Sequence, residues 1–312
     1  MVAAPPDAGG RADSGGHPPL AVIVVNWHRE QETIDCVNSL QSWQRLCPEI
    51  IVVDNGSGLD AVSRLREALP GVEILANDSN LGFGAANNRA LASTGARVVL
   101  LLNNDARIGE EDTTRLLETL RSRPQAGFVG PVLEGASPPH PVLSAGGRDP
   151  VRFGRTHSTA DDRRQELERA EPFAVDYVPG TALLALRRTF EALDGFEEDF
   201  FFSGETADLC ARGRRLGYQS FVVPLSRCRH NLETSAPLRD TLYAYYSLRN
   251  RFLLLRRSRG GGLAGARWVA SGALRSLLSL ATGRIARARC LVLALADGLR
   301  GRFGPANPRV ER

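Results

Sequence analysis

A short polar sequence, Asn103-Asn104-Asp105, follows directly after the apolar run from Val98 to Leu102. The run has no polar alternation, which is typical of a strand buried on both faces at the centre of a sheet. A carboxylate that ends such a strand lies at the carboxyl edge of the sheet, where open α/β sheets bind their ligands. There it can hold a divalent cation on a diphosphate. The chemistry that this sequence suggests is therefore the binding of an anionic, diphosphate-bearing ligand.

Polar residues also follow three earlier apolar runs of the chain. Asn26 follows the run 20–25, Asp54 follows the run 50–53, and the polar loop 77–88 follows the run 72–75. Each polar segment taken alone is equally well explained as a turn at a strand end. Together they provide what a nucleotide pocket needs, a carboxylate that accepts from a base or ribose and small residues that allow close approach. The G-x-G-x-x-N sequence starting at Gly82 follows the third run, not the first, so we discount it as a dinucleotide fingerprint.

The elements that must position these residues alternate between strand and helix through the first hundred residues. Apolar residues at helical spacing precede residue 46, a helix is expected over 60–69, and a short helix ends at Gly95. Because the strands are too apolar for an exposed sheet, this order predicts a mostly parallel α/β sheet covered on both faces. The elements expected after Asp105 are a helix over 110–123, a strand over 127–132, an irregular excursion over 134–172, strand character over 175–186, a helix carrying Glu205 and Asp208, a strand over 219–223 closed by Pro224, and helical segments over 237–257 and 263–300.

The composition limits the class of protein. The chain has 312 residues, of which 43% are hydrophobic and 24% charged, as is ordinary for a globular protein. Its net charge of +4 suits an anionic substrate or a membrane surface and does not indicate nucleic acid. Five cysteines without CxxC spacing argue against a disulfide framework and fit a reducing cytoplasm. Residues 1–19 predict a disordered tail, and no apolar run approaches the roughly 20 residues that span a bilayer.

Four sequences of the first half resemble, in their order, a known family. They are VIVVNW from Val22, VVDNGS from Val52, NLGFGAAN from Asn80 and LLLNND from Leu100. This set looks like the nucleotide-binding half of the family-2 glycosyltransferases with the GT-A fold, and most of all like their bacterial rhamnosyltransferase-like branch. Residues 175–230 continue the similarity, which covers roughly residues 20–255. The resemblance implies a GT-A-like domain of Rossmann-like character.

The resemblance also assigns roles to single residues. Asp54 would contact the base or ribose of an NDP-sugar. Asp105 would bind Mg²⁺ or Mn²⁺ on the diphosphate as the last residue of a DxD-like motif, in which Asn103 replaces the first Asp. His230 matches a family histidine that can complete metal binding, although a loop histidine without such a role is an equally good interpretation. The remaining residues that would line the nucleotide-sugar pocket are Asn26, Asn80, Gly82, Gly84, Asn87 and Asn104.

The main departure from the family concerns the catalytic base. In relatives this base is the Asp of a Glu-Asp pair, in a stretch resembling FFxYEDxDLCxR, and the matching residues here are Glu205-Thr206-Ala207-Asp208. Thr206 stands at the position of the base, and its hydroxyl cannot take a proton from a substrate at neutral pH. We favour Glu205 as the base and expect Asp208 to be structural or to position the acceptor. The alternative is a catalytically degenerate protein that binds sugar nucleotides or serves as a scaffold.

The activity that the resemblance implies is an inverting, metal-dependent hexosyltransferase. It would move a sugar from a dTDP-, UDP- or GDP-linked donor to a hydroxyl acceptor, such as a lipid-linked glycan, in the synthesis of cell-surface polysaccharide or glycoconjugates. Rhamnose from dTDP-rhamnose is the favoured donor. A nucleotidyltransferase is a weaker alternative, because the chain lacks the Gly-rich, Arg/Lys-bearing first loop of such enzymes.

The expected organisation is a glycosyltransferase domain over residues 20–235 followed by a helical region over 236–312. The domain would divide into a nucleotide-binding half to residue 130 and an acceptor half from residue 131. Arginines recur over 249–257 and again after residue 263. They predict either a basic surface that binds anionic lipid headgroups at the inner face of the membrane or helices that simply pack on the domain.

Overall fold

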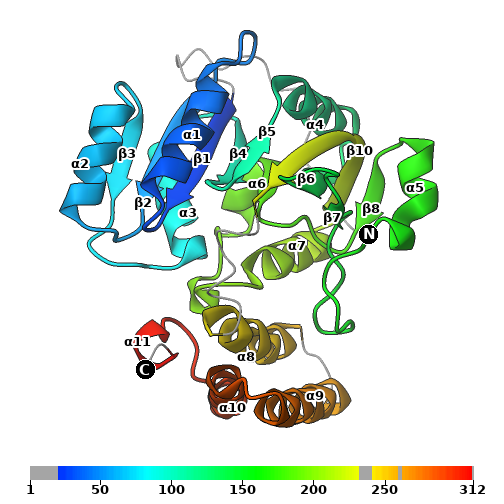
Figure 1. Ribbon diagram of the computed structural model, residues 1–312. Helices are drawn as coiled ribbons and strands as arrows, with labels where there is room; N and C mark the ends of the chain where they lie inside the picture. Colours follow the sequence, from blue (N-terminus) through cyan, green and yellow to red (C-terminus); the bar gives the residue numbers. More distant parts are fainter. Residues whose placement is uncertain (1–19, 232–240, 259–261, 311–312) are drawn as a thin grey trace.

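The computed structural model describes residues 20–231, 241–258 and 262–310, whose strands join in one mixed sheet (Figure 1). The strands are β1 (Leu20–Asn26), β2 (Glu49–Asp54), β3 (Glu73–Ala76), β4 (Val98–Asn103), β5 (Ala106–Ile108), β6 (Ala126–Gly135), β7 (Val142–Ser144), β8 (Phe173–Val175), β9 (Ala182–Leu186) and β10 (Gln219–His230). Their order is β3-β2-β1-β4-β9-β6-β10-β5, with β7 paired to β6 and β8 to β10. Strands β3, β2, β1 and β4 are parallel, and β9 lies antiparallel between β4 and β6. The predicted α/β sheet is confirmed, with antiparallel strands added in its second half.

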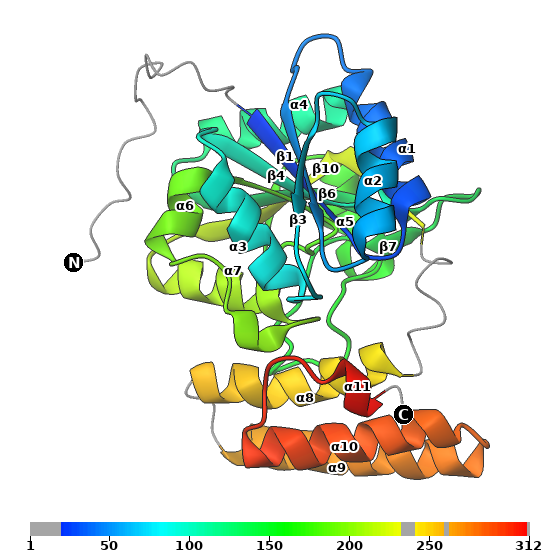
Figure 2. The same cartoon turned by 90° about the vertical axis from the view of Figure 1, so that its left-hand side faces the viewer.

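Helices cover both faces of the sheet, and three further helices form a layer beyond it (Figures 1 and 2). The helices are α1 (Glu30–Gln41), α2 (Leu59–Ala68), α3 (Phe83–Ser93), α4 (Glu110–Ser122), α5 (Arg164–Arg169), α6 (Arg187–Ala192), α7 (Glu205–Arg215), α8 (Leu242–Arg257), α9 (Gly262–Ala281), α10 (Ile285–Arg300) and α11 (Asn307–Val310). Side chains of α1, α2 and α4 share one hydrophobic core, and those of α3, α6 and α7 share the other. The sheet is thus enclosed on both sides, as its continuous apolar runs predict.

Strand β1 shows how the sheet is held between its two cores. Val22 and Val24 belong to the core with α1, α2 and α4, whereas Ile23 belongs to the core with α3, α6 and α7. Successive side chains of a strand point to opposite faces, so a strand buried on both faces must be apolar throughout. Each fully buried side chain of this size contributes roughly 1.5–3 kcal/mol. This burial makes the carboxyl ends of β1, β2 and β4 a rigid edge for a binding site.

The strand that we expected to end before Pro224 continues to His230. Strand β10 pairs in parallel with β6, and the register shifts between Val223 and Arg227. Proline has no backbone N–H to give to a ladder, and it is tolerated in a strand where pairing is interrupted by such a bulge. The expectation of a strand over 219–223 closed by proline is therefore wrong in its length. The extension carries His230 to the sheet edge, where it pairs antiparallel with Ala106 of β5.

The excursion expected over residues 134–172 is more ordered than the sequence indicates. It contains the end of β6, strand β7, a 3₁₀ turn at Asp161–Arg163 and helix α5. Gly147 forms isolated bridges to both His157 and Tyr177, which tie the excursion to the segment before β9. Short elements of three to six residues leave no clear periodicity in a sequence.

The C-terminal helices α8, α9 and α10 lie beneath the sheet domain, with α8 nearest to it (Figure 2). Their shared core includes Leu248 of α8, Trp268 of α9 and Leu291 of α10, all buried. The Tyr245 hydroxyl donates to Asp297 at 2.7 Å and joins α8 to α10 inside this core. In the described segments, no helix combines the length and apolarity needed to cross a membrane. The predicted tail over 1–19 and the boundary at residues 235 and 236 lie outside the described residues.

Candidate functional site

The carboxyl ends of the parallel strands meet at one edge of the sheet, as the sequence predicts. In the ladder registers, Asn26 is paired with Asp54, Asp54 with Ala76, and Val25 with Asn103. Because neighbouring strands lie about 4.8 Å apart, the residues that follow these strands share one small region. The edge therefore assembles polar residues from segments that are far apart in the chain.

Asp54 is held in a buried hydrogen-bond network at this edge. Its Oδ1 accepts from Asn26 Nδ2 at 2.7 Å, and its Oδ2 accepts from the Ser57 backbone N–H at 3.0 Å. Asn26 Oδ1 accepts in turn from the Thr33 hydroxyl at 2.7 Å. Asn26 and Asp54 are both fully buried. The Asn26 side chain thus binds Asp54, Ser57 and Thr33, and its proposed contact with a nucleotide sugar stays a prediction.

The loop before α3 is organised by Asn55, a residue that the sequence arguments did not single out. Its Nδ2 donates to Asn80 Oδ1 at 3.0 Å, and its Oδ1 accepts from Asn77 Nδ2 at 2.9 Å and from Leu81 N at 3.0 Å. Asn80 Oδ1 also accepts from the Gly82 backbone N–H at 2.9 Å. The structure thus brings Asn80 and Gly82 next to the end of β2, joined through Asn55. The signal for this role was available, since Asn55 directly follows Asp54 in a turn.

Gly82 lies where the loop approaches the segment that precedes α7. Its φ of +88° favours glycine, and a Cβ there would come within 2.5 Å of the Phe201 carbonyl oxygen. The Phe83 N–H donates to that same oxygen at 2.8 Å. Gly84 packs against Phe196, and a Cβ added to Gly84 would lie 3.1 Å from the Phe196 Cβ. These two glycines therefore permit close contact between protein segments in this structure.

Asn87 and Asn104 make local contacts. Asn87 is buried, and its Nδ2 donates to the Phe83 carbonyl one turn earlier at 2.8 Å. Asn104 Nδ2 donates to the Thr33 hydroxyl at 3.0 Å, which ties the end of β4 to α1. Asn104 lies at the carboxyl edge of the sheet, as expected, whereas the buried Asn87 bonds to the backbone of its own helix, α3. Their proposed contacts with a nucleotide sugar stay predictions.

Asp105 and His230 meet although 125 positions separate them in the sequence. The distance from Asp105 Oδ1 to His230 Nε2 is 3.1 Å, and the two side chains are 14% and 13% exposed. The contact arises because β5 and the last residues of β10 pair antiparallel, and the Asn231 N–H donates to the Asp105 carbonyl at 2.9 Å. His230 is thus a strand residue at the predicted metal position and not a loop histidine.

The chemistry of this pair fits a divalent cation. A carboxylate oxygen and an imidazole nitrogen are donors that Mn²⁺ accepts, and Mg²⁺ is commonly held by one or two carboxylates together with substrate phosphates. Within the described residues, no group of three or more His, Cys, Asp or Glu side chains could form a complete metal cage. A cation at Asp105 and His230 would therefore need oxygens from its ligand, as a diphosphate provides.

Glu205 lies at the N-terminus of α7 and borders a cavity of about 670 Å³. Asn103, Gly180 and Thr206 line the same cavity. Burial raises the pKa of Glu205 to about 7, although backbone N–H groups at the helix start hold it down. A carboxylate with this pKa can accept a proton near neutral pH. The structure therefore places the predicted base in a cavity that extends to the motif containing Asp105.

Asp208 does not share the environment of Glu205. It is 3% exposed, and its two oxygens accept from Arg212 Nε and Arg257 Nε, each at 2.7 Å. A buried carboxylate held by two guanidinium groups is fixed in place and is not available to a substrate. Of the two roles expected for Asp208, structural or acceptor-positioning, these contacts favour the structural one, and its role stays a prediction. Asp208 joins α7 to α8.

The segment before Glu205 is held by α8. Asn250 Nδ2 donates to the carbonyls of Phe200, Phe202 and Ser203 at 2.9, 2.9 and 2.6 Å. Arg249 is fully buried and donates to the Phe200 carbonyl at 3.0 Å. Phe201 and Ser203 have positive φ values of 61° and 71°, a costly conformation for non-glycine residues that needs such support. Sequence reasoning missed Arg249 and Asn250, because their partners lie about 50 positions away.

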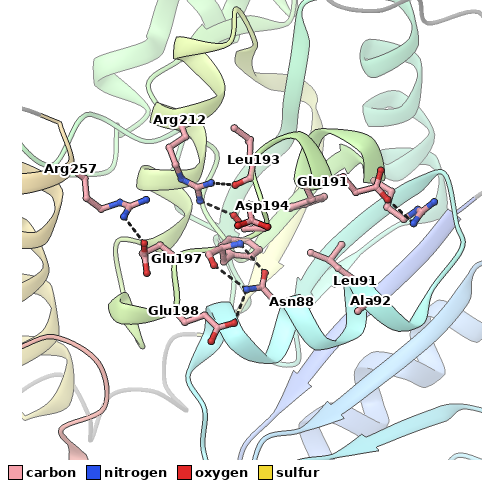
Figure 3. Close-up of a pocket in the computed structure, with 14 residues that line it drawn as sticks. Asn88, Leu91, Ala92, Glu191, Leu193, Asp194, Glu197, Glu198, Arg212 and Arg257 are labelled. Carbon is pink, nitrogen blue, oxygen red and sulfur yellow. Dashed lines mark hydrogen bonds and ion pairs between the residues drawn. The ribbon is translucent and has the colours of Figure 1, made fainter.

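A second hollow, of about 930 Å³, lies between α3, α6 and the segment before α7 (Figure 3). Most of its charged side chains are engaged with the protein itself. Arg257 pairs with Glu197, Arg212 donates to the Gly195 carbonyl at 2.8 Å, and Asn88 Nδ2 donates to Glu198 at 3.0 Å. None of the predicted site residues lines it. The cavity beside Glu205 is therefore the candidate active site.

Comparisons with known proteins agree with this geometry. The family model described as glycosyl transferase family 2 matches residues 21–146. The N-acetylglucosaminyl-diphospho-decaprenol L-rhamnosyltransferase of Mycobacterium tuberculosis is 30% identical over 274 residues, which cover 80% of this chain and 88% of that protein. The dTDP-rhamnosyl transferase RfbF of Shigella flexneri is 23% identical over 298 residues, covering 91% and 97% of the two chains.

A solved structure shares the fold. The mannosyltransferase PcManGT from Pyrobaculum calidifontis, in complex with GDP-Man and Mn²⁺, has a TM-score of 0.57 at 18% identity and covers 92% of this chain and 88% of its own. This likeness shows the GT-A fold. The extent of the similarity to the mycobacterial relative shows the family as well. This chain belongs to glycosyltransferase family 2 and is a glycosyltransferase similar to the rhamnosyltransferases.

Proposed function

We propose that the chain transfers L-rhamnose from dTDP-rhamnose to a hydroxyl group of a lipid-linked glycan acceptor, with inversion and with a divalent cation. Two relatives are named as rhamnosyltransferases, and the name of one includes a diphospho-decaprenol acceptor. PcManGT was solved with a nucleotide sugar and Mn²⁺. These names support the donor, acceptor and cation, and the site geometry supports the mechanism.

The observation that carries the proposal is the environment of Glu205. This buried carboxyl group has a pKa of about 7 and borders the same cavity as Asn103, two positions before Asp105. If the diphosphate of the donor binds at Asp105 and His230, its sugar would extend into the cavity, and the acceptor would bind beyond the sugar. Catalysis of this reaction needs a base on the face of the sugar opposite the leaving diphosphate.

The proposed step is a single displacement. The acceptor hydroxyl oxygen forms a bond to the anomeric carbon while the bond from that carbon to the diphosphate oxygen breaks. Glu205 takes the hydroxyl proton, and the nucleoside diphosphate leaves with the bonding electron pair. General-base assistance of this kind contributes typically 10²–10⁴-fold to the rate. Burial of Glu205 matches its pKa to the pH at which it must accept a proton.

On the other side of the sugar, Asp105 and His230 would hold a divalent cation that binds the leaving diphosphate. A divalent cation bound there would neutralise charge that develops on the diphosphate. Asp105 would supply a carboxylate oxygen and His230 an imidazole nitrogen, and the antiparallel pairing of β5 with β10 brings these two atoms within 3.1 Å of each other. Asn26 and the Ser57 N–H keep Asp54 oriented at the strand edge, next to the place proposed for the nucleoside.

The test is a transfer assay with dTDP-rhamnose, Mn²⁺ and a diphosphate-linked lipid GlcNAc acceptor. Glu205→Gln is expected to lower kcat at least 100-fold, because Gln cannot accept the proton, with dTDP affinity unchanged. Asp105→Asn is expected to weaken Mn²⁺-dependent dTDP binding at least tenfold in calorimetry, whereas Asp60→Asn, an exposed carboxylate of α2, should behave as wild type. Near-normal turnover of Glu205→Gln would refute the assignment of the base.

We also infer that the chain contacts a membrane surface through α9 and α10. Residues 262–296, which comprise α9 and most of α10, contain five arginines and no Asp or Glu. Leu263, Leu277 and Ile285 of this region are 90%, 64% and 70% exposed. Apolar side chains bordered by arginines suit the interface of an anionic bilayer. Such a contact would bring the cavity near an acceptor that resides in the membrane.

A further inference from the structure

The cavity beside Glu205 has a positively charged wall on the side of the C-terminal helices. Glu205 is the only acidic residue among its described lining residues, and Arg155, Arg251 and Arg275 are its arginines. Arg155 is neutralised by Asp162, whose two oxygens each accept from Arg155 Nη2 at 2.7 Å. The other two arginines, from α8 and α9, give the wall its net charge.

Arg251 is held in place without a carboxylate. Its guanidinium donates to the carbonyls of Pro150, Phe153 and Gly154 at 2.6, 2.9 and 2.9 Å and lies 3.8 Å from the centre of the Trp268 ring. These contacts leave its positive charge uncompensated. Burial lowers the pKa of Arg251 to about 10, and the nearby positive charge of Arg275 acts in the same direction. Arg251 therefore stays charged at neutral pH.

Within the described residues, the Arg275 guanidinium makes no hydrogen bond and no ion pair, although the residue is half-buried at the cavity wall. Burial and the neighbouring charge of Arg287 lower its pKa. A partly buried charge without a partner is costly, and proteins rarely keep one unless a ligand or partner compensates it. Two neighbouring positive charges favour an anion with several oxygens, and the Arg275 guanidinium can bind phosphate oxygens in a planar, two-bond arrangement.

The stripe of α9 that carries Arg275 continues from the cavity to an apolar surface. Trp268, Ser271, Arg275 and Leu278 recur at intervals of three and four residues and so lie along one side of the helix. The first three line the cavity, whereas Leu278 and its neighbour Leu274 are 57% and 58% exposed. A ligand with its phosphate at Arg275 would therefore have an apolar surface beside it.

We propose that Arg275, supported by Arg251, forms the binding subsite for the phosphate groups of a lipid-diphosphate acceptor. This inference rests on the proposed function in one respect, namely that the ligand of this cavity is the acceptor of the transfer reaction. The acceptor's sugar would lie toward Glu205, its phosphates at Arg275, and its lipid along Leu274 and Leu278. Arg275 is a residue of acceptor binding and takes no part in the transfer of the proton.

The proposal is tested by binding farnesyl diphosphate in a buffer containing EDTA, so that no cation can recruit a diphosphate to Asp105. Calorimetry is expected to show that Arg275→Gln weakens this binding at least tenfold. The matched control is Arg284→Gln, which removes an exposed arginine of the same two-helix region outside the cavity. The control should remain within twofold of wild type, and melting temperatures of both variants should show that they are folded.

Two further probes identify the source of the phosphate. Farnesol and inorganic pyrophosphate are each expected to bind at least tenfold more weakly than farnesyl diphosphate. Equal binding of farnesol would overturn the phosphate subsite, and equal binding of pyrophosphate would overturn the lipid-linked ligand. Unchanged affinity in Arg275→Gln would overturn the role of this arginine. Because no donor or cation is present, these results are independent of whether rhamnose transfer is found.

Discussion

At the scale of single residues, Glu205 is balanced between two opposing effects. Its position at the start of α7 favours the ionised carboxylate through backbone N–H groups, while burial favours the neutral acid. Burial has the larger effect and raises the pKa to about 7. Thr206, at the position of the usual base, packs its methyl group 3.0 Å from where a Cβ on Gly180 would lie. The site is thus built around Glu205, with Thr206 as part of the wall.

The pKa of Glu205 leads to a prediction for the pH dependence of transfer. Only the ionised carboxylate can accept a proton, so kcat/KM should rise about tenfold per pH unit below pH 7 and level off above it. The measurement is a kcat/KM profile with dTDP-rhamnose from pH 5.5 to 8.5. A profile that is flat across pH 6 to 8 would show that the ionisation of Glu205 does not control kcat/KM.

The raised pKa of Glu205, the proposed base, also predicts a cost in the stability of the folded protein. Between the ordinary Glu pKa of 4.5 and about 7, the folded protein holds a proton that the unfolded chain has lost. Stability therefore falls as pH rises through this window, by about 3 kcal/mol in total. Glu205→Gln, which remains neutral, should exceed wild type in urea unfolding at pH 8 and match it near pH 4.5. An identical pH dependence of the two proteins would contradict the raised pKa.

At the scale of elements, helix α8 binds the segment that precedes α7 and also packs against the other C-terminal helices. Arg249 and Asn250 bind carbonyl groups of the segment that precedes α7, and Arg257 reaches Asp208 on α7 itself. Carbonyl groups that turn inward need donors, and α8 supplies them. The position of Glu205 therefore depends on a helix outside the sheet domain.

This dependence can be tested with Asn250→Ala. The change removes three hydrogen bonds to backbone carbonyls and is expected to cost about 1–3 kcal/mol of stability. Because the freed segment carries Glu205, kcat should fall at least tenfold while the KM for the donor stays within threefold. Asn38→Ala, an exposed residue of α1, is the matched control. Equal losses of donor affinity and kcat would indicate general disruption of the fold instead.

The elements that the sequence predicts well are those whose signal is local. Strands β1, β2 and β4 are continuous apolar runs, and the polar residues after them mark the sheet edge without any knowledge of pairing. The pairing of Asp105 with His230 was implied only by the resemblance, because Pro224 masks the second half of β10 and β5 has three residues. The roles of Asn250 and Arg275 depend on contacts between distant segments, which composition and periodicity do not record.

At the scale of the whole molecule, the helices α9 and α10 form the layer farthest from the sheet (Figure 1). The pattern of α9 is opposite to that of an ordinary surface helix, since its buried residues include Gly272, Ser276 and Ser279 while many of its leucines are exposed. The exposed apolar residues of α9 that recur at helical spacing are Leu263, Ala266, Ala270, Ala273, Leu277 and Leu280. Large exposed apolar surfaces on a protein mark interaction sites. Because residues 262–296 contain no Asp or Glu, we propose an anionic bilayer as the partner of this surface.

This arrangement predicts binding to vesicles that contain phosphatidylglycerol. Wild type should float with phosphatidylglycerol vesicles in a sucrose gradient, and raised salt should release it because exposed charges are screened. Leu277→Ser combined with Leu280→Ser should reduce the bound fraction at least fivefold, since the apolar contact is lost on one stripe of α9. Leu216→Ser, which changes a leucine 49% exposed beyond the end of α7, is the matched control. Equal binding to neutral phosphatidylcholine vesicles, or full binding by the double variant, would place the membrane contact elsewhere.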